Sequence, residues 1–166
     1  ARDGGKVLYV SGEESVSQIK SRSDRLGFSG RGVYMLAETN ADEIVRHLDE
    51  FRPALAMVDS VQTIHCDDLP SGPGSVAQVR ESTLRIMRWA KASAVPVIMA
   101  GHVTKDGSLA GPRVLEHMVD AVLHLEGGGA SAYRILRGAK NRFGSTDEVG
   151  IFQMGSDGLE EVLDPS

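Results

Sequence analysis

The segment Ala54-Leu-Ala-Met-Val-Asp-Ser-Val-Gln-Thr-Ile-His65 decides the fold class. It begins with five apolar residues, and Asp59 and Ser60 close that run. A short uninterrupted apolar run with a polar end is typical of a strand that is buried on both faces of a parallel sheet. Open α/β sheets bind ligands at the carboxyl ends of such strands. The segment therefore predicts an α/β fold in which Asp59 and Ser60 lie at a binding site.

This segment also has the form of a Walker B element. In such elements a strand-end Asp orders a magnesium ion and its water shell beside nucleotide phosphates. The plainer alternative is a buried strand that is followed by a turn, and residues 54–65 alone favour that alternative. Evidence for nucleotide chemistry has to come from the rest of the chain.

Composition places the chain among globular proteins with one domain. It has 166 residues, of which 41% are hydrophobic and 25% are charged, and it holds no apolar run of membrane-spanning length. The formal net charge of -5 gives no general basic surface, so any contact with DNA must rest on local basic loops. Cys66 is the only cysteine, which excludes an internal disulfide framework and predicts a cytoplasmic location.

Strand and helix patterns alternate in the first two thirds of the chain. Strands are expected at residues 6–10, 33–36, 54–58 and 96–100, with helices that begin after Ser15, Asn40 and Ser75 between them. Two hairpins are expected next, one pairing 121–125 with 133–136 and the other pairing 149–154 with 159–162. In the third helix, four basic residues are expected to face solvent: Arg80, Arg85, Arg88 and Lys91. This order predicts a parallel sheet followed by an antiparallel extension.

Six segments in order carry a family resemblance: VSGEES at 10–15, VDSVQT at 58–63, PGSVAQVR at 73–80, GHVTK at 101–105, AGPRVLEHMV at 110–119 and KNRFG at 140–144. Together they resemble the bacterial RadA (Sms) family of RecA-related ATPases, and the KNRFG segment is the most specific of them. The resemblance implies a RecA-like P-loop NTPase core, which is a three-layer α/β/α fold. Its sheet is mostly parallel with an antiparallel C-terminal extension. This core would occupy residues 1–162, and 163–166 would begin a linker to a Lon-protease-like domain.

The resemblance implies three catalytic residues at strand ends. Glu13 would polarise the water that attacks the γ-phosphate of ATP, and Asp59 would order Mg²⁺ through water with Ser60 beside it. His102 would sense the γ-phosphate. The plainer alternatives are an exposed first-turn acid for Glu13 and a hydrogen-bonded polar side chain for His102.

The resemblance also implies contacts with DNA and with a neighbouring subunit. Lys140 and Arg142 would reach the ATP of the next subunit, as an arginine finger does, and would contribute to DNA binding. The loops at 65–75 and 103–113 match the two RecA-type DNA-binding loops, and the second offers Lys105 and Arg113 to phosphates. The first loop contains two acidic residues, which places its DNA role in doubt.

One element of the family pattern is missing. The chain has no Gly-x-x-x-x-Gly-Lys-Ser/Thr loop, whose backbone amides and lysine cradle the triphosphate. The sequence is therefore expected to begin after the P-loop strand and helix. In RecA-like sheets that strand lies between the strands expected at 96–100 and 121–125, so its loss would leave two apolar edges unpaired. The chain is expected to be rearranged, self-associated or a proteolytic product.

Two functional hypotheses follow. The first is a fragment of an ATP-dependent DNA motor, a helicase or branch-migration enzyme of homologous recombination and DNA repair. Its parent would use ATP and Mg²⁺, form a hexameric ring, bind single-stranded or branched DNA and cooperate with a RecA-type recombinase. The second is a catalytically inactive oligomerisation or DNA-contact module. In either case the isolated chain is expected to bind no nucleotide tightly, because the phosphate cradle is missing.

Overall fold

The computed structural model describes residues 4–102, 114–127 and 132–163. The first part of the chain forms a parallel sheet of four strands in the order β2-β1-β3-β4. Its elements are β1 (Val7–Ser11), α1 (Val16–Arg25), β2 (Val33–Ala37), α2 (Ala41–Phe51), β3 (Leu55–Asp59), the short 3₁₀ helix η1 (Val61–Thr63), α3 (Val76–Ser93) and β4 (Val97–Met99). The predicted alternation of strands and helices is confirmed.

The last part of the chain forms an antiparallel sheet in the order β5-β6-β7-β8. Its strands are β5 (Ala121–Glu126), β6 (Tyr133–Asn141), β7 (Val149–Gly155) and β8 (Gly158–Glu161). Both predicted hairpins are present, because β5 pairs with β6 and β7 pairs with β8. Residues 128–131, between β5 and β6, lie outside the described residues.

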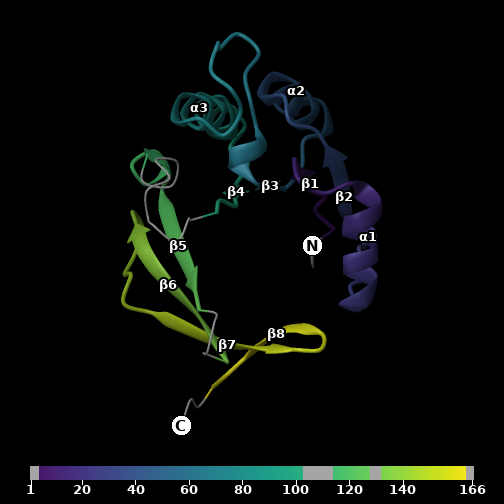
Figure 1. The fold of residues 1–166 in the computed structure, drawn as a ribbon, viewed down its shortest axis with the longest axis vertical. Helices are drawn as coiled ribbons and strands as arrows, with labels where there is room; N and C mark the ends of the chain where they lie inside the picture. Colours follow the sequence, from purple (N-terminus) through teal and green to yellow (C-terminus); the bar gives the residue numbers. More distant parts are fainter. Residues whose placement is uncertain (1–3, 103–113, 128–131, 164–166) are drawn as a thin grey trace.

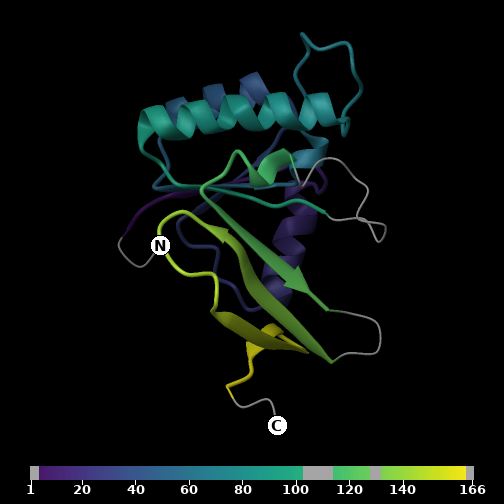
Figure 2. The ribbon, with the colours of Figure 1, turned by 90° about the vertical axis from the view of Figure 1, so that its left-hand side faces the viewer.

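Helices α2 and α3 lie side by side over one face of the parallel sheet, and α1 lies on the opposite side near β2 (Figures 1 and 2). The hydrophobic core forms under α2 and α3. It joins Val10 of β1 and Val58 of β3 to Ile44, Leu48 and residues of α3. No helix among the described residues is long and apolar enough to cross a membrane.

The prediction that the 54–58 strand is buried on both faces was wrong. In β3, Ala56 and Val58 are fully buried, whereas Leu55 and Met57 are only partly buried. Alternate residues of a strand point to opposite faces. The face under α2 and α3 is fully covered, and the other face is covered less completely. An uninterrupted apolar run does not reveal this difference.

The chain was expected to be rearranged, self-associated or a proteolytic product, and the described residues contradict the first of these three alternatives. Rearrangement would join β4 directly to β5, but these strands are end strands of two separate sheets. Ile98 on β4 is exposed, as are Leu123 and Leu125 on β5. The two edges therefore remain unpaired within the described residues, as the missing family strand led us to expect.

Candidate active site

The carboxyl ends of β1, β3 and β4 lie together at the same end of the parallel sheet. Ser11 of β1 is in register with Asp59 of β3, and the Gly12 amide donates to the Asp59 carbonyl at 2.9 Å. The Val61 amide donates to the Ala100 carbonyl at 3.0 Å, which ties the end of β3 to the end of β4. Residues that directly follow these strands are therefore brought together although they are far apart in the sequence.

Glu13 is the centre of a cluster that we call the Glu13 cluster, which consists of Glu13, Ser60 and His102. The Ser60 hydroxyl donates to Glu13 Oε1 at 2.6 Å, and His102 Nε2 lies 3.2 Å from the same oxygen. The Glu13 side chain is 40% exposed and that of His102 is 66% exposed. The cluster is thus held together by contacts to one carboxylate oxygen, and its acid and imidazole remain accessible to solvent.

Gly12 explains how closely the ends of β1 and β3 approach each other. A Cβ atom at this position would overlap the side chain of Thr63. The Thr63 hydroxyl in turn donates to the Ser60 carbonyl at 2.8 Å. Glycine is needed here because of the close contact, and its position one residue before Glu13 sets the place of the carboxylate.

Asp59 belongs to a neighbouring hydrogen-bonded pair. The Tyr9 hydroxyl donates to Asp59 Oδ2 at 2.5 Å. Burial and this contact with the Asp59 carboxylate raise the pKa of Tyr9 to about 12. Tyr9 therefore occupies one carboxylate oxygen and fixes the orientation of the other. Sequence reasoning missed Tyr9 because it lies within β1, two residues before the strand ends.

The Tyr9 hydroxyl gives a prediction about stability at high pH. A tyrosine whose pKa is raised from 10.0 to about 12 on folding stabilises the protein below pH 10. That contribution is expected to disappear between about pH 10 and about pH 12 as the hydroxyl ionises. Urea unfolding at several pH values checks this, with Tyr9→Phe as the comparison. An unchanged pH dependence in Tyr9→Phe would show that the loss comes from other groups.

The oxygen atoms at these strand ends fit a magnesium ion held through water. Asp59, Glu13 and Ser60 offer hard oxygen ligands, which Mg²⁺ prefers. The described residues contain no group of three or more His, Cys, Asp or Glu side chains that could hold a metal directly. In proteins Mg²⁺ keeps most of its water and binds through one or two carboxylates plus substrate phosphates. The sequence contains no Gly-x-x-x-x-Gly-Lys-Ser/Thr pattern to complete such a site.

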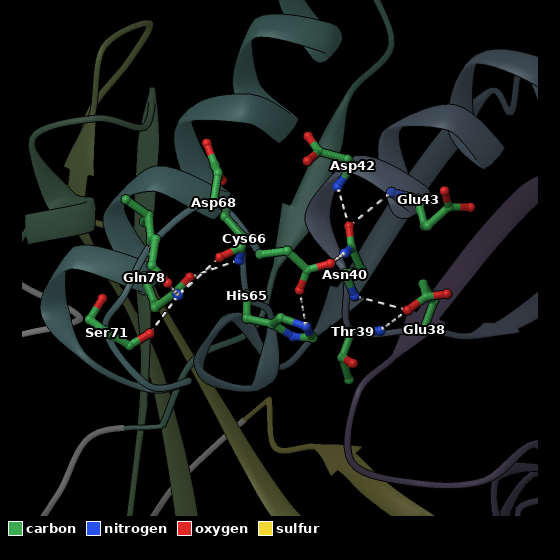
Figure 3. Close-up of polar contacts among 12 residues, drawn as sticks. Glu38, Thr39, Asn40, Asp42, Glu43, His65, Cys66, Asp68, Ser71 and Gln78 are labelled. Atoms are coloured by element: carbon green, nitrogen blue, oxygen red, sulfur yellow. Dashed lines mark hydrogen bonds and ion pairs between the residues drawn. The ribbon is translucent and has the colours of Figure 1, made fainter.

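The 65–75 loop was predicted to contact DNA. Hydrogen bonds from the buried side chain of Gln78 hold its backbone in place. Gln78 Oε1 accepts from the Cys66 amide at 2.7 Å, and Gln78 Nε2 donates to the carbonyls of Cys66 at 3.1 Å and Ser71 at 2.7 Å (Figure 3). Gln78 follows the helix cap Ser75 by three residues, a spacing typical of a capping box. Its side chain instead binds the loop backbone, and only the Ser75 half of the box forms.

Arg85 of α3 also binds the 65–75 loop, through an ion pair with Asp68. Its guanidinium binds both carboxylate oxygens of Asp68 at 2.8 and 2.7 Å and reaches Asp42 of α2 at 2.7 Å. The contact with Asp68 is the main cause of the raised pKa of Arg85. The prediction that Arg85 faces solvent was wrong, since its side chain is only 19% exposed. The acidic loop residue Asp68 thus binds α3.

The two cations of the KNRFG segment are held within the chain. Lys140 Nζ donates to the carbonyls of Glu116 at 2.7 Å and Val119 at 2.8 Å. Arg142 forms an ion pair with Asp120 at 2.9 Å, and both of these side chains are about half exposed. The structure does not bring either cation to the Glu13 cluster. The predicted DNA contacts Lys105 and Arg113 lie outside the described residues.

Comparison with solved structures defines the class of the fold. A KaiC-like protein from the archaeon Pyrococcus horikoshii aligns with 97% of this chain and 78% of its own, with a TM-score of 0.69 and 16% sequence identity. That likeness, together with the parallel sheet and its antiparallel extension, shows a RecA-like α/β core. No protein-family model matches the chain.

Comparison with curated sequences identifies the family. The chain is 56% identical over 161 residues to the DNA repair protein RadA of Halalkalibacterium halodurans, and 54% identical over 160 residues to that of Bacillus subtilis. These alignments cover 97% and 96% of this chain and 35% of each relative. The chain belongs to the RadA family. It spans about a third of the length of the curated relatives it matches.

Proposed function

We propose that this chain supplies the catalytic acid, the magnesium-ordering acid and the phosphate sensor of an ATP-driven motor. The motor would act as a helicase or in branch migration on single-stranded or branched DNA during recombination and repair. The Glu13 cluster carries the proposal, because it joins an acid, a hydroxyl and an imidazole at the carboxyl ends of neighbouring parallel strands. Membership in a family of DNA repair proteins and the RecA-like fold support it.

The residues of the cluster have separate roles in this proposal. Glu13 orients a water molecule for attack on the γ-phosphate, which is mainly a positioning task in phosphoryl transfer. Ser60 donates to Glu13 and so restricts the carboxylate to one orientation. The His102 side chain is 66% exposed, so it is accessible to a phosphate. Bound Mg²⁺ would neutralise phosphate charge, and Asp59 would hold one of its waters through the oxygen that Tyr9 leaves free.

The phosphate cradle has to come from elsewhere in the longer protein. The relatives extend well beyond the aligned segment, since the alignments cover only 35% of their length. We infer that a P-loop strand of the longer protein lies between β4 and β5, which are end strands of their sheets and have no further partner strand among the described residues. This would bring the phosphates to the strand ends that hold the Glu13 cluster.

Contacts with a neighbouring subunit and with DNA are part of the same proposal. In a ring, which we propose to be a hexamer, Arg142 is better placed than Lys140 to reach a neighbour's ATP. Arg142 would give up one exposed ion pair, which contributes little stability. Lys140 would give up two hydrogen bonds to backbone carbonyls. Lys140 therefore orders the segment, Arg142 acts across the interface, and a RecA-type recombinase is the proposed partner on DNA.

The alternative is a catalytically inactive oligomerisation or DNA-contact module. The edges of β4 and β5 that have no partner strand in the described part of the chain favour it, because exposed strand edges pair readily with other chains. Apolar side chains on both edges strengthen that tendency, and Ile98, Leu123 and Leu125 are all exposed. The chain also has no loop with the Walker A pattern.

Measuring ATP hydrolysis separates the two functions. The assay uses this chain and a full-length RadA protein that carries it as the corresponding segment, each with and without single-stranded DNA. In the full-length protein, Asp59→Ala is expected to lower turnover about 100-fold or more, because the magnesium-ordering acid is lost. Asp157→Ala is the control, since Asp157 is an exposed residue between β7 and β8.

Each outcome decides between the hypotheses. Steady hydrolysis by the isolated chain that Asp59→Ala abolishes would refute the inactive module. Full activity of Asp59→Ala in the full-length protein would refute the proposed motor.

A further inference from the structure

Gln62 connects the segment after β3 to the end of β4. It lies in η1, and its side-chain Nε2 donates to the His102 carbonyl at 3.0 Å. The residue before it, Val61, donates its amide to the Ala100 carbonyl at 3.0 Å. The ends of β3 and β4 are therefore joined by one backbone bond and one side-chain bond, and the side-chain bond reaches the backbone of a residue of the Glu13 cluster.

Packing alone does not require an amide at position 62. The amide lies against Gly101, where a Cβ atom would be 3.4 Å from Nε2 and 3.6 Å from Oε1. Gln62 Oε1 is buried and has no hydrogen-bond partner among the described residues. A buried amide oxygen without a partner is unfavourable, and a methionine would fill similar space without that penalty. The bond from Nε2 to His102 is the contact that an apolar side chain of this size would lose.

His102 depends on this bond for its orientation. Its imidazole is 66% exposed, and its Nε2 atom lies 3.2 Å from Glu13 Oε1. Which rotamers such a ring can adopt depends on the backbone dihedral angles of its residue. The backbone carbonyl of His102 is held by Gln62. Loss of that bond would free the peptide and with it the direction of the ring.

We propose that Gln62 is a positioning residue that fixes the His102 backbone so that the imidazole faces Glu13. This inference deepens the proposed function and rests on it, because His102 and Glu13 matter for turnover only if the cluster acts on ATP. The geometric part concerns this chain alone. It can therefore be tested without nucleotide.

The first test measures the contact between His102 and Glu13 by NMR. In the unmodified chain, Glu13→Gln removes a charge 3.2 Å from the imidazole and is expected to shift the His102 ring signals. In the Gln62→Met chain the same change is expected to shift them at least about twofold less, because coupled residues respond non-additively. The thermal midpoint of Gln62→Met is expected to equal or exceed that of the unmodified chain, since the unpaired oxygen is gone.

The control is Gln153→Met, which makes the same change at an exposed position of β7. It is expected to leave the His102 response unchanged. The inference would be overturned if Glu13→Gln shifted the His102 ring signals as much in the Gln62→Met chain as in the unmodified chain. A lowered thermal midpoint together with a general loss of NMR dispersion would also overturn it, in favour of a packing role.

The second test measures kinetics in the full-length protein that carries this chain. Gln62→Met is expected to lower kcat for ATP about tenfold and to change KM less than about twofold, because the residue acts on the oriented cluster and not on binding. If Glu13→Gln leaves turnover unchanged, the proposed function fails while the NMR result still judges Gln62. If Glu13→Gln abolishes turnover and Gln62→Met leaves kcat unchanged, the inference about Gln62 fails alone.

Discussion

Glu13→Gln is expected to lower ATP turnover of a full-length RadA protein carrying this chain by about 10²- to 10⁴-fold, the usual range for a catalytic acid or base. Glutamine keeps the shape of the side chain and an oxygen that can accept from Ser60, which lies 2.6 Å from Glu13 Oε1. It loses the negative charge that polarises the attacking water. Steady-state hydrolysis measures the loss, and thermal unfolding is expected to show little change in stability.

Glu14→Gln is the matched control for this prediction. Glu14 is the next residue and carries the same charge, but its carboxylate pairs with Arg22 at 2.6 Å. Loss of a partly exposed ion pair costs about 1 kcal/mol or less. We expect turnover in Glu14→Gln to stay near that of the unmodified protein. Equal losses in the two variants would show that the general negative charge of this region matters and that Glu13 has no special role.

Gln78→Leu is expected to lower the free energy of unfolding of this chain by about 3 kcal/mol, because it removes several buried hydrogen bonds at once. The leucine would leave the amide of Cys66 and the carbonyl of Ser71 without their partner. Urea denaturation measures this loss. The 65–75 loop is also expected to become more sensitive to proteolysis, since Gln78 fastens its backbone (Figure 3).

Gln153→Leu is the control at an exposed site, where such a substitution changes stability by about 0.5 kcal/mol or less. A similarly small effect of Gln78→Leu would contradict the view that Gln78 holds the loop. A large stability loss without faster cleavage in the loop would place the role of Gln78 in the core of α3.

The placement of Glu13, Asp59 and His102 at the same end of the parallel sheet could be predicted because it follows from parallel strand order. Each residue lies at or just after the end of a strand, and neighbouring parallel strands end at the same edge. The register of β1 with β3 produces this arrangement directly. Such an arrangement depends on the order of strands and helices along the chain, which hydrophobic periodicity reveals.

The partners of Tyr9, Gln62 and Gln78 could not be predicted in the same way. Each is a polar side chain that contacts a residue distant in sequence, and no periodic pattern marks such a pair. Tyr9 looked like a typical strand residue, and the spacing of Gln78 from Ser75 indicated a helix cap. In each case tertiary contacts decided where the polar atoms bind.

Arg85 shows a related limit of sequence reasoning. Four basic residues on one helix are typical of a solvated face, and that pattern gives no sign of acidic residues on other elements. Asp42 lies on α2 and Asp68 lies in the 65–75 loop, and both bind Arg85. The unequal burial of the two faces of β3 was missed for a comparable reason. The sequence of a strand does not show which other elements cover its faces.

A crystal structure of the full-length protein with Mg²⁺ and a non-hydrolysable ATP analogue would show whether the Glu13 cluster lies at the γ-phosphate. The predicted result places the γ-phosphate beside the ends of β1, β3 and β4, with a water molecule within hydrogen-bond reach of the Glu13 carboxylate. Asp59 would contact a water bound to Mg²⁺. A γ-phosphate bound away from these strand ends, with Glu13 facing only bulk solvent, would contradict the account.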